Sequence, residues 1–267
     1  MGHGRRINIQ AQRHGLQSQY QELDGDAHSI DLPPVRIIDM RQELHAGNRS
    51  IFSRALSRAL SEALDAGQQA ILFLNRRGSS TYIFCRDCGW VARCSRCDAS
   101  LTHHEHDDLW HCHHCGATTQ RKNECPNCRS DRVRRFGVGT QKVQNEIETL
   151  FPGIRSLRWD RDSTRAKGAH EIILAHFAAH RADVLIGTQM LAKGLDLPLV
   201  TLVGVISADV GLNLPDYRAA ERTFQVLTQV AGRAGRGLLG GKVVLQSFQP
   251  DHYAIQSAAR HDYHAFY

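Results

Sequence analysis

The sequence predicts an α/β protein in which a parallel sheet is covered by helices and carries a small inserted zinc-binding module. Two observations predict this fold. Short apolar runs alternate with amphipathic helical stretches along most of the chain, as they do in parallel sheets. All eight cysteines lie between residues 85 and 128, shortly after the first apolar run, and their spacing is that of metal ligands. A chain of 267 residues can form one large or two small domains.

The first strand of the sheet is expected to follow an amphipathic helix. The stretch "SIFSRALSRALSEALDAG" has one apolar face, with Ser50 as the expected N-cap and Gly67 as the stop signal. It leads into "AILFLN" (70–75), an apolar run with the length of a buried strand. Residues 1–48 are polar and are expected to be largely irregular, with "LPPV" (32–35) as a linker.

Beyond the cysteines the alternation resumes and completes the predicted sheet. Thr140 is the expected N-cap of the first helix in this part of the chain. The cysteine-rich segment is therefore predicted to be an insertion after the first strand of the sheet. The predicted helices cover residues 140–151, 169–180 and 216–232, and the predicted strands cover residues 154–159, 183–188, 200–206 and 242–248.

Composition and charge restrict the possible partners only weakly. The chain contains no run of 18 apolar residues, so no transmembrane helix is expected. The formal net charge is +6, but two zinc ions held by eight thiolates would cancel four of these positive charges. A net positive charge suggests an anionic partner such as nucleic acid. Because the two zinc sites would lower that charge, the suggestion is weak.

The cysteines form four C-x-x-C pairs: Cys85/Cys88, Cys94/Cys97, Cys112/Cys115 and Cys125/Cys128. Two residues between thiolates let one tight turn direct both sulfurs at a single tetrahedral ion. Gly89 and Gly116 follow their pairs, where a glycine can adopt positive φ. The first residues, "MGHGRRINIQAQRHG", lack the apolar core of a secretory signal. Zinc is therefore favoured over disulfides and over a redox or iron–sulfur role.

Spacing indicates which pairs share an ion. The fourteen residues between Cys97 and Cys112, "DASLTHHEHDDLWH", are predicted to form a hairpin with Asp107 and Asp108 at its turn. A hairpin would bring the two flanking pairs together, and the remaining two pairs would form an outer site by elimination. A cross-braced grouping of Cys85/Cys88 with Cys112/Cys115 is the alternative. The expected sites are Cys94, Cys97, Cys112 and Cys115 (inner) and Cys85, Cys88, Cys125 and Cys128 (outer).

Both predicted sites are closed shells of four thiolates. A closed shell leaves no position for a reactive water, so the zinc is expected to be structural rather than catalytic. Histidines near the cysteines are expected at the surface or behind the ligands, although any of them could replace a thiolate; these are His111, His113 and His114. Trp90 and Trp110 are expected to pack against the small metal core rather than stack on a base.

Two further stretches suggest binding of phosphate and nucleic acid. In "QVAGRAGRG" (229–237), Arg233 and Arg236 lie among glycines after a predicted helix, and guanidinium groups bind phosphate oxygens in bidentate fashion. In "DVLIGTQMLAKGLDLP" (183–198), a predicted strand ends in a turn with short hydrogen-bonding side chains suited to a nucleic-acid backbone. Loops that follow parallel strands are common ligand sites.

These stretches resemble the motifs of a known family. "IGTQMLAKGLDLP" is similar to helicase motif V, "QVAGRAGRG" to motif VI, and "ILFLNRRG" to the opening strand of the second RecA-like lobe of superfamily 2 helicases. The four cysteine pairs after "NRRG", with "LPPVRIIDMRQEL" (32–44) and "ADVGLNLPDYRAAERTFQ" (208–225), resemble the primosomal protein N′ (PriA) family of replication-restart DNA helicases. The resemblance runs from about residue 30 to the C-terminus.

The resemblance implies an ATP-dependent 3′→5′ DNA helicase that recognises stalled replication forks and restarts replication by primosome assembly. Its cofactors would be two structural Zn²⁺ ions, with ATP and Mg²⁺ in the complete enzyme. Its partners would be branched DNA, primosome proteins, single-stranded DNA-binding protein and the replicative helicase loader. The resemblance implies no binding to a membrane. The implied location is the bacterial cytoplasm, in association with the nucleoid, with roles in DNA repair and recombination.

The resemblance also implies roles for individual residues. Arg233 and Arg236 would reach the γ-phosphate of ATP, with Arg236 as the finger that stabilises transition-state charge. Asp196 and Gln229 would belong to the nucleotide site and help couple it to DNA. Asp196 as a turn or cap residue and Lys193 as a solvated surface residue are the competing interpretations. The residues implied near the DNA backbone are Thr188, Gln189 and Lys193.

The sequence also departs from the family. A helicase needs G-x-x-x-x-G-K-[ST] to bind the triphosphate, and only Gly241–Lys242 comes near, with Val243 where Ser or Thr is required. No D-E-x-[HD] motif occurs either. We therefore expect the first helicase lobe to be missing, the chain to be a fragment that stops within a helix at "HDYHAFY", and the chain alone to lack ATPase and unwinding activity.

The predicted organisation has three parts, and the function has alternatives. Residues 1–48 would hold the end of the first lobe and a linker, residues 49–84 and 133–267 the second RecA-like lobe, and residues 85–132 the two-zinc module. One alternative is a zinc-ribbon protein that grips DNA or a protein partner without using ATP. Another is a different ATPase class with a similar lobe, against which the four cysteine pairs argue.

Overall fold

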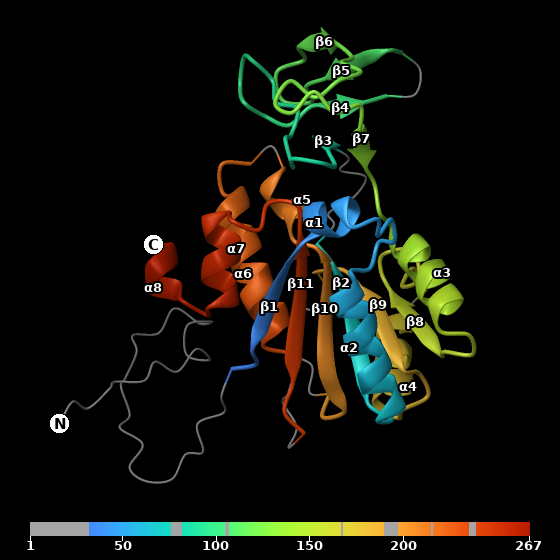
Figure 1. The fold of residues 1–267 in the computed structure, drawn as a ribbon. Helices are drawn as coiled ribbons and strands as arrows, with labels where there is room; N and C mark the ends of the chain where they lie inside the picture. The colour runs from blue at the N-terminus through green and yellow to red at the C-terminus, as the bar shows by residue number, and fades with distance from the viewer. Residues whose placement is uncertain are drawn as a thin grey trace, which may run out of the picture. The chain divides into compact units, whose positions relative to one another are not determined.

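The computed structural model describes residues 32–75, 82–104, 107–166, 168–189, 197–214, 216–234 and 239–267. They belong to one compact unit, Leu32–Tyr267. At its centre lies a six-stranded sheet in which every neighbouring pair is parallel (Figure 1). The predicted parallel α/β fold is confirmed. In spatial order the strands are β1 (Val35–Asp39), β11 (Lys242–Ser247), β10 (Val200–Ser207), β2 (Gln69–Leu74), β9 (Val184–Gly187) and β8 (Ser156–Trp159).

Helices cover both faces of this sheet, and each face has its own apolar core. Successive side chains of a strand point to opposite faces, so Leu72 and Phe73 of β2 belong to different cores. Gly204 of β10 lets one helix approach closely, because a Cβ there would lie 2.7 Å from Cδ1 of Leu56. One face packs against α2 (Arg54–Asp65) and α3 (Thr140–Leu150), and the other against α4 (Ala169–Ala178), α6 (Ala219–Ala231) and α7 (Tyr253–Ala259).

The starts of two helices differ from the sequence prediction. The side chain of Ser53 caps α2, whereas the Ser50 hydroxyl donates to a glutamate of α3 at 2.8 Å. Gly139 is the N-cap of α3, and the hydroxyl of Thr140 donates to Asp160 at 2.5 Å. In both cases a partner from another element engages the hydroxyl that was expected to cap the helix, and the helix begins elsewhere.

The prediction of irregular structure up to residue 48 is wrong for residues 35–45. Strand β1 pairs with β11 along its whole length, from Val35 opposite Val243 to Asp39 opposite Ser247. The short helix α1 (Met40–His45) follows directly. An edge strand has one neighbour and a partly buried surface, so "VRIID" lacks the continuous apolar run that marks the central strands. The other predicted domain boundaries stay predictions.

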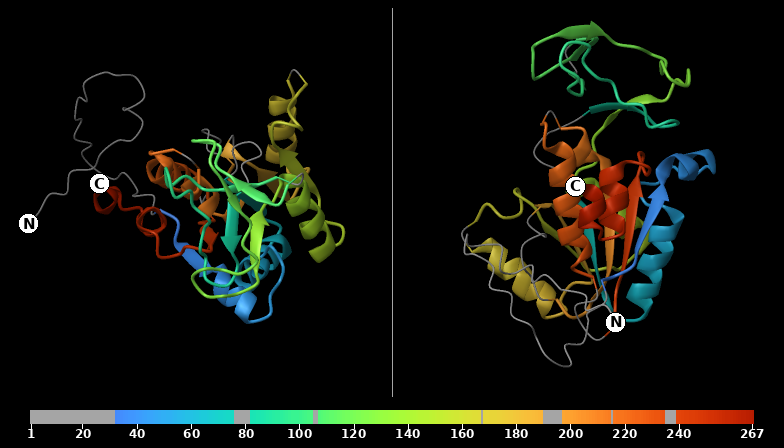
Figure 2. Two further views of the ribbon diagram at one scale, coloured as in Figure 1. Left: turned by 90° about the horizontal axis from the view of Figure 1, so that it is seen from above. Right: turned by 90° about the vertical axis from the view of Figure 1, so that its left-hand side faces the viewer.

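The cysteine-rich segment forms a separate small module between β2 and α3. Its stem is an antiparallel pair, β3 (Tyr82–Cys85) with β7 (Val133–Phe136). The predicted hairpin is present as β4 (Thr102–His103) and β5 (Leu109–His111). A third strand that the sequence did not indicate, β6 (Thr118–Gln120), pairs with β5. Figures 1 and 2 show the module at the end of the sheet where the strands finish.

Two short helices complete the described fold, α5 (Asp209–Leu212) directly after β10 and α8 (Tyr263–Phe266). A side chain at Gly211 of α5 would collide with Thr223 and Asn75, because its Cβ would lie 2.3 Å and 2.4 Å from their polar atoms. Helix α5 is therefore held tightly between α6 and the end of β2. Within the residues described, no helix has the length and apolar character needed to cross a bilayer.

Candidate functional site: two metal centres and the ends of the sheet

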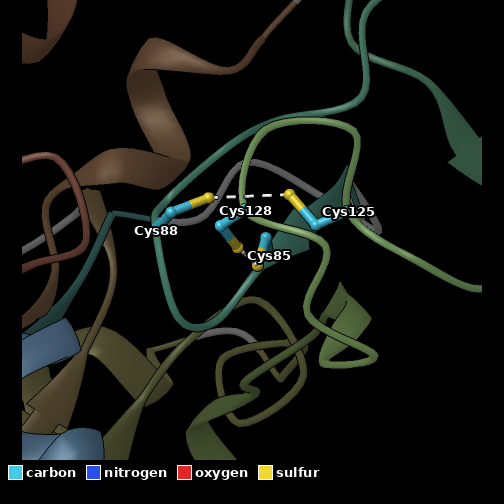
Figure 3. Close-up of side chains that lie close together, drawn as sticks. All are labelled: Cys85, Cys88, Cys125 and Cys128. Atoms are coloured by element: carbon cyan, nitrogen blue, oxygen red, sulfur yellow. Dashed lines mark hydrogen bonds between the residues drawn. The ribbon is translucent and has the colours of Figure 1, made fainter.

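The structure gathers the eight cysteines into two groups of four. In each group the sulfur atoms all lie within 4.8 Å of one another. Figure 3 shows the outer group, in which two pairs that are distant in sequence face each other. This is the nested grouping that the hairpin indicated, and the cross-braced grouping is not found. The groups are Cys85, Cys88, Cys125 and Cys128 (outer) and Cys94, Cys97, Cys112 and Cys115 (inner).

The distances between sulfurs fit a tetrahedral metal ion. A zinc ion with bonds of about 2.3 Å to four sulfurs separates them by roughly 3.8 Å. The observed separations are 3.6 Å for Cys85–Cys128 and Cys88–Cys125. In the inner group they are 3.6 Å for Cys94–Cys115 and 3.4 Å for Cys97–Cys112. All eight cysteines are free rather than disulfide-bonded, so the two groups are consistent with two structural zinc ions.

Each C-x-x-C pair is shaped by the same tight turn. The residue after the second cysteine donates its N–H to the carbonyl of the first, as from Gly89 to Cys85 at 2.9 Å. That residue has positive φ in all four turns, as the sequence predicted for Gly89 (76°) and Gly116 (73°). Asp98 (58°) and Arg129 (60°) adopt the same conformation without being glycines. The turn therefore tolerates residues other than glycine at this position.

The thiols differ in how readily they ionise in the absence of metal. Burial raises the pKa of Cys85 to about 12. Burial also acts to raise the pKa of Cys112, but N–H groups of Cys115 and His114 donate to its sulfur and lower it to about 6. A metal ion needs thiolates. Each group contains one thiol whose pKa is raised to about 12, Cys85 in the outer group and Cys97 in the inner group, so metal binding at either group must displace a tightly held proton and is coupled to pH.

Aromatic and histidine side chains surround the inner group without joining it. Trp110 is buried and packs beside Trp90 with ring centroids 6.3 Å apart, within the small core built around the cysteines. The predicted packing of both tryptophans against the metal core is confirmed. The ring of His111 contacts Asp107 at 2.8 Å, and His113 contacts another histidine. Neither replaces a cysteine among the four sulfurs.

The described residues proposed for DNA and for nucleotide lie on different elements. Thr188 and Gln189 follow directly after β9, at its carboxyl end, and are half-buried. Helix α6 runs back from the end of β10 toward the start of β11, so its last turn points away from the carboxyl ends of the strands (Figure 1). Gln229 is exposed in that last turn. Arg233 comes two residues after α6 and is only 7% exposed.

Three predicted site residues lie outside the described part of the chain: Lys193, Asp196 and Arg236. Their described neighbours show where the two motifs are anchored. Leu197 and Ala234 are both buried in the same apolar core, on the face covered by α4, α6 and α7. These two described residues therefore pack into the same layer of the lobe.

The residue that sequence analysis missed is Asp209, the first residue of α5. Its carboxylate is fully buried and accepts hydrogen bonds from three consecutive residues, the last residue of β11 and the two that follow it. The signal was present, because this acidic residue follows the apolar strand "VTLVGVIS" almost directly. A buried carboxylate must find several donors to be tolerated.

Two family models match the chain. The helicase conserved C-terminal domain matches residues 129–237, and the PriA DNA helicase Cys-rich region domain matches residues 94–119. The second match begins at Cys94 and contains the four cysteines of the inner group. The first covers α3, the parallel strands β8, β9 and β10, and α6.

Curated relatives extend over most of the chain. The replication restart protein PriA of Bacillus subtilis (strain 168) is 51% identical over 236 residues, which are 88% of this chain and 29% of the relative. That of Synechocystis is 51% identical over 254 residues, 94% of this chain and 31% of the relative. The Haemophilus influenzae protein is 41% identical over 86% of this chain and 31% of the relative.

The chain thus spans about a third of the length of the curated relatives that it matches. Within that span the relatives cover both the cysteine-rich module and the parallel-sheet lobe, and one of the matching family models is specific for the cysteine-rich region. The nested cysteine groups, the lobe and these matches agree, and the chain belongs to the PriA family of replication restart proteins.

Proposed function

We propose that this chain forms the zinc module and second motor lobe of an ATP-dependent 3′→5′ DNA helicase, which recognises stalled replication forks and restarts replication by primosome assembly. The observation that carries the proposal is the nested pair of four-cysteine groups, inserted after β2 of a lobe that matches the conserved C-terminal helicase domain. In the complete enzyme, branched DNA, primosome proteins, single-stranded DNA-binding protein and the replicative helicase loader would be its partners, in the bacterial cytoplasm.

The proposed roles divide between DNA and nucleotide. Thr188 and Gln189 would contact the DNA backbone at the end where the module lies, and Lys193 is proposed for the same contact. Arg233 and Arg236, with the nucleotide-site residues Asp196 and Gln229, would meet the phosphates of ATP and its Mg²⁺. These positions would serve an ATP site shared with a second lobe, because no triphosphate-binding G-x-x-x-x-G-K-[ST] motif occurs in the sequence. The two zinc ions would hold the module in shape.

A complementation assay tests the motor assignment. The chain is mixed with a separately expressed lobe that carries the triphosphate-binding motif, and ATP hydrolysis is measured with forked DNA. We expect turnover only in the mixture, and a loss of several orders of magnitude with Arg236→Ala. Arg181→Ala, at an exposed arginine without a proposed role, is the matched control.

Two results would count against this proposal. A mixture of folded, associated lobes without ATPase activity would reject the motor assignment. Turnover by this chain alone that Arg236→Ala abolishes would reject the expectation that a second lobe is needed.

A second candidate is a module that binds DNA or protein without ATP, which the lack of a triphosphate-binding motif favours. Fork binding and zinc content are compared for the chain with and without residues 85–128, with helix content as a check of folding. Two zinc ions per chain, lost together with the segment, are expected. Fork binding that falls with the segment would support direct DNA contact, and unchanged binding would favour a protein partner.

A further inference from the structure

The zinc module is docked on the lobe through a small apolar cluster of its own. Phe84 of the stem meets Phe248, the residue after β11, edge to face with ring centroids 4.9 Å apart. Tyr82 and Val91 from the module and Val210 from α5 complete the buried cluster. A side-chain bond from Ser100 of the module to the lobe adds a polar contact at one edge. The cluster belongs to neither of the two main cores of the lobe.

The outer cysteine turn approaches the backbone of the lobe closely. Gly89 directly follows Cys88, and a Cβ on it would lie 2.5 Å from the backbone carbonyl oxygen of Phe248. Its φ is +76°, a conformation that also favours glycine. The outer turn thus rests directly on the backbone of Phe248, which is the seat of the module on the lobe.

The carboxylate of Asp209 fixes this seat. Its Oδ2 accepts the N–H of Phe248 at 2.9 Å. Its Oδ1 accepts the hydroxyl of Ser247 at 2.6 Å and the N–H of Gln249 at 3.1 Å. Asp209 has no solvent exposure. The three consecutive residues that carry the seat are therefore held by one side chain, and both of its oxygens are used.

Asp209 is also linked to the module from the other side. It is the first residue of α5, and its neighbour Val210 belongs to the docking cluster. At the end of the same helix, the carbonyl of Asn213 accepts the hydroxyl of Ser100 at 2.5 Å. The pKa of Tyr82, at the base of the module, is raised by burial and further by the negative charge of Asp209.

A carboxylate is the side chain that this place requires. Burying one is costly unless donors surround it, and burial does raise the pKa of Asp209 against the opposing effect of the bonds from Ser247, Phe248 and Gln249. An asparagine of the same shape could keep only one oxygen as acceptor. Its NH₂ group would then face the backbone N–H of Phe248 or of Gln249, so one of the bonds that hold the loop to this side chain would be lost.

We propose that Asp209 is a positioning residue for the zinc module: it holds the backbone of Phe248, on which the outer cysteine turn rests, and so keeps the module docked at the carboxyl end of the sheet. This is the end at which Thr188 and Gln189 lie. The inference goes beyond the proposed function and does not depend on it, because docking can be measured without ATP, DNA or a second lobe.

Hydrogen exchange of the zinc-loaded 267-residue chain tests the proposal. Asp209→Asn is expected to raise exchange at least about tenfold in two segments, residues 86–92 of the outer turn and residues 247–250 of the seat. Zinc is expected to stay at two ions per chain, with residues 94–116 unchanged. Asp216→Asn is the matched control, because this acidic residue lies on the same connection between β10 and α6, and its carboxylate bonds to Arg222 and to the backbone N–H of Arg218, both outside the two segments.

The other outcomes of the exchange experiment also support or reject the role proposed for Asp209. Faster exchange confined to residues 247–250 would overturn the proposal, because Asp209 would then order only its own loop. Should Asp209→Asn fail to fold, Ser247→Ala removes one donor and leaves the carboxylate in place, and the same two segments are compared. Faster exchange in both supports the proposal, and an unchanged segment 86–92 rejects it. The double variant Asp209→Asn with Ser247→Ala is expected to exchange only slightly faster than Asp209→Asn alone, because both changes act on one contact.

Discussion

The lobe and the zinc module are held together by different interactions. In the lobe, β2, β9 and β10 are buried along their whole length between two apolar cores. In the module, the strands are two to four residues long and β6 is fully exposed. The one core of the module contains cysteines themselves, together with Trp110. The lobe is stabilised by apolar burial, and the module has too little apolar area to fold in that way.

This difference explains why the two parts meet as they do. A segment that depends on metal ligands has short, rigid turns and few side chains to interdigitate with a neighbour. Its contact with the lobe is accordingly small, and it relies on close backbone approach at Gly89 and on one buried acidic side chain, Asp209. Metal binding would fix the shape of the module, while the lobe fixes its place.

Removal of zinc should separate the two parts most clearly. A chelator is expected to unfold the module, because structural zinc in small domains contributes about 10–16 kcal/mol of apparent binding energy. The helix signal in far-ultraviolet circular dichroism should persist, since all described helices lie outside residues 85–132. Re-addition of zinc should restore protection from hydrogen exchange in the module. Loss of the helix signal together with zinc would show that the lobe depends on the module.

Paired cysteine variants should show which turns share an ion. Cys88→Ser with Cys125→Ser removes two ligands of the outer group and should leave one zinc per chain. Cys88→Ser with Cys94→Ser removes one ligand from each group and should leave none, because a zinc site with three thiolates is much weaker. Metal content by mass spectrometry of the native chain measures this. Equal zinc loss in the two double variants would contradict the nested grouping seen in the structure.

The sequence was most informative where one interaction type dominates. The lobe could be predicted because its central strands, such as "AILFLN", are continuous apolar runs. The cysteine groups could be predicted because a hairpin between Cys97 and Cys112 restricts which turns can meet. In both cases the pattern is local, and a short stretch of chain contains nearly all of the information.

The remaining features depend on residues that meet only after folding. Strand β1 was missed because its partner β11 lies about two hundred residues further along the chain. The caps of α2 and α3 were misplaced because Ser50 and Thr140 bond to other elements. The role of Asp209 was missed because its donors come from the end of β11 and the two residues after it, about forty residues further along the chain. Neither the secondary-structure propensity of a residue nor the spacing of residues in the sequence indicates such pairings.

A change in the sheet core should affect the lobe and leave the module's metal in place. Phe73 is fully buried in β2, and Phe73→Ala should lower the free energy of unfolding by about 3–5 kcal/mol through lost burial and the cavity left behind. Urea denaturation measures this change, and zinc content should stay at two per chain. Leu150→Ala, at a leucine that is 44% exposed, should change stability by less than about 0.5 kcal/mol. Zinc loss in folded Phe73→Ala would show that the two parts share one cooperative unit.

The smallest effect is expected at an ion pair on the far side of the lobe from the module. Asp183, just before β9, accepts the backbone N–H of Arg155 at 3.0 Å and pairs with its guanidinium. The side-chain hydrogen bond from Arg155 lowers the pKa of Asp183 below its ordinary 3.8. A carboxyl whose pKa is lower in the folded state stabilises that state above the unfolded pKa, and this contribution is lost as the pH falls through the folded pKa.

Asp183→Asn should therefore reduce stability at pH 7 by less than about 1 kcal/mol, the range of exposed ion pairs. The difference from the unchanged chain should shrink as the pH falls below about 4, because the unchanged carboxyl is then protonated as well. Urea denaturation at pH 7 and at pH 3 measures both values. Zinc should also leave the module in acid, because its thiolates become protonated, so the comparison is made on chelated protein in which only the lobe is folded. A difference that grows in acid would mean that folding raises the pKa of Asp183 instead of lowering it.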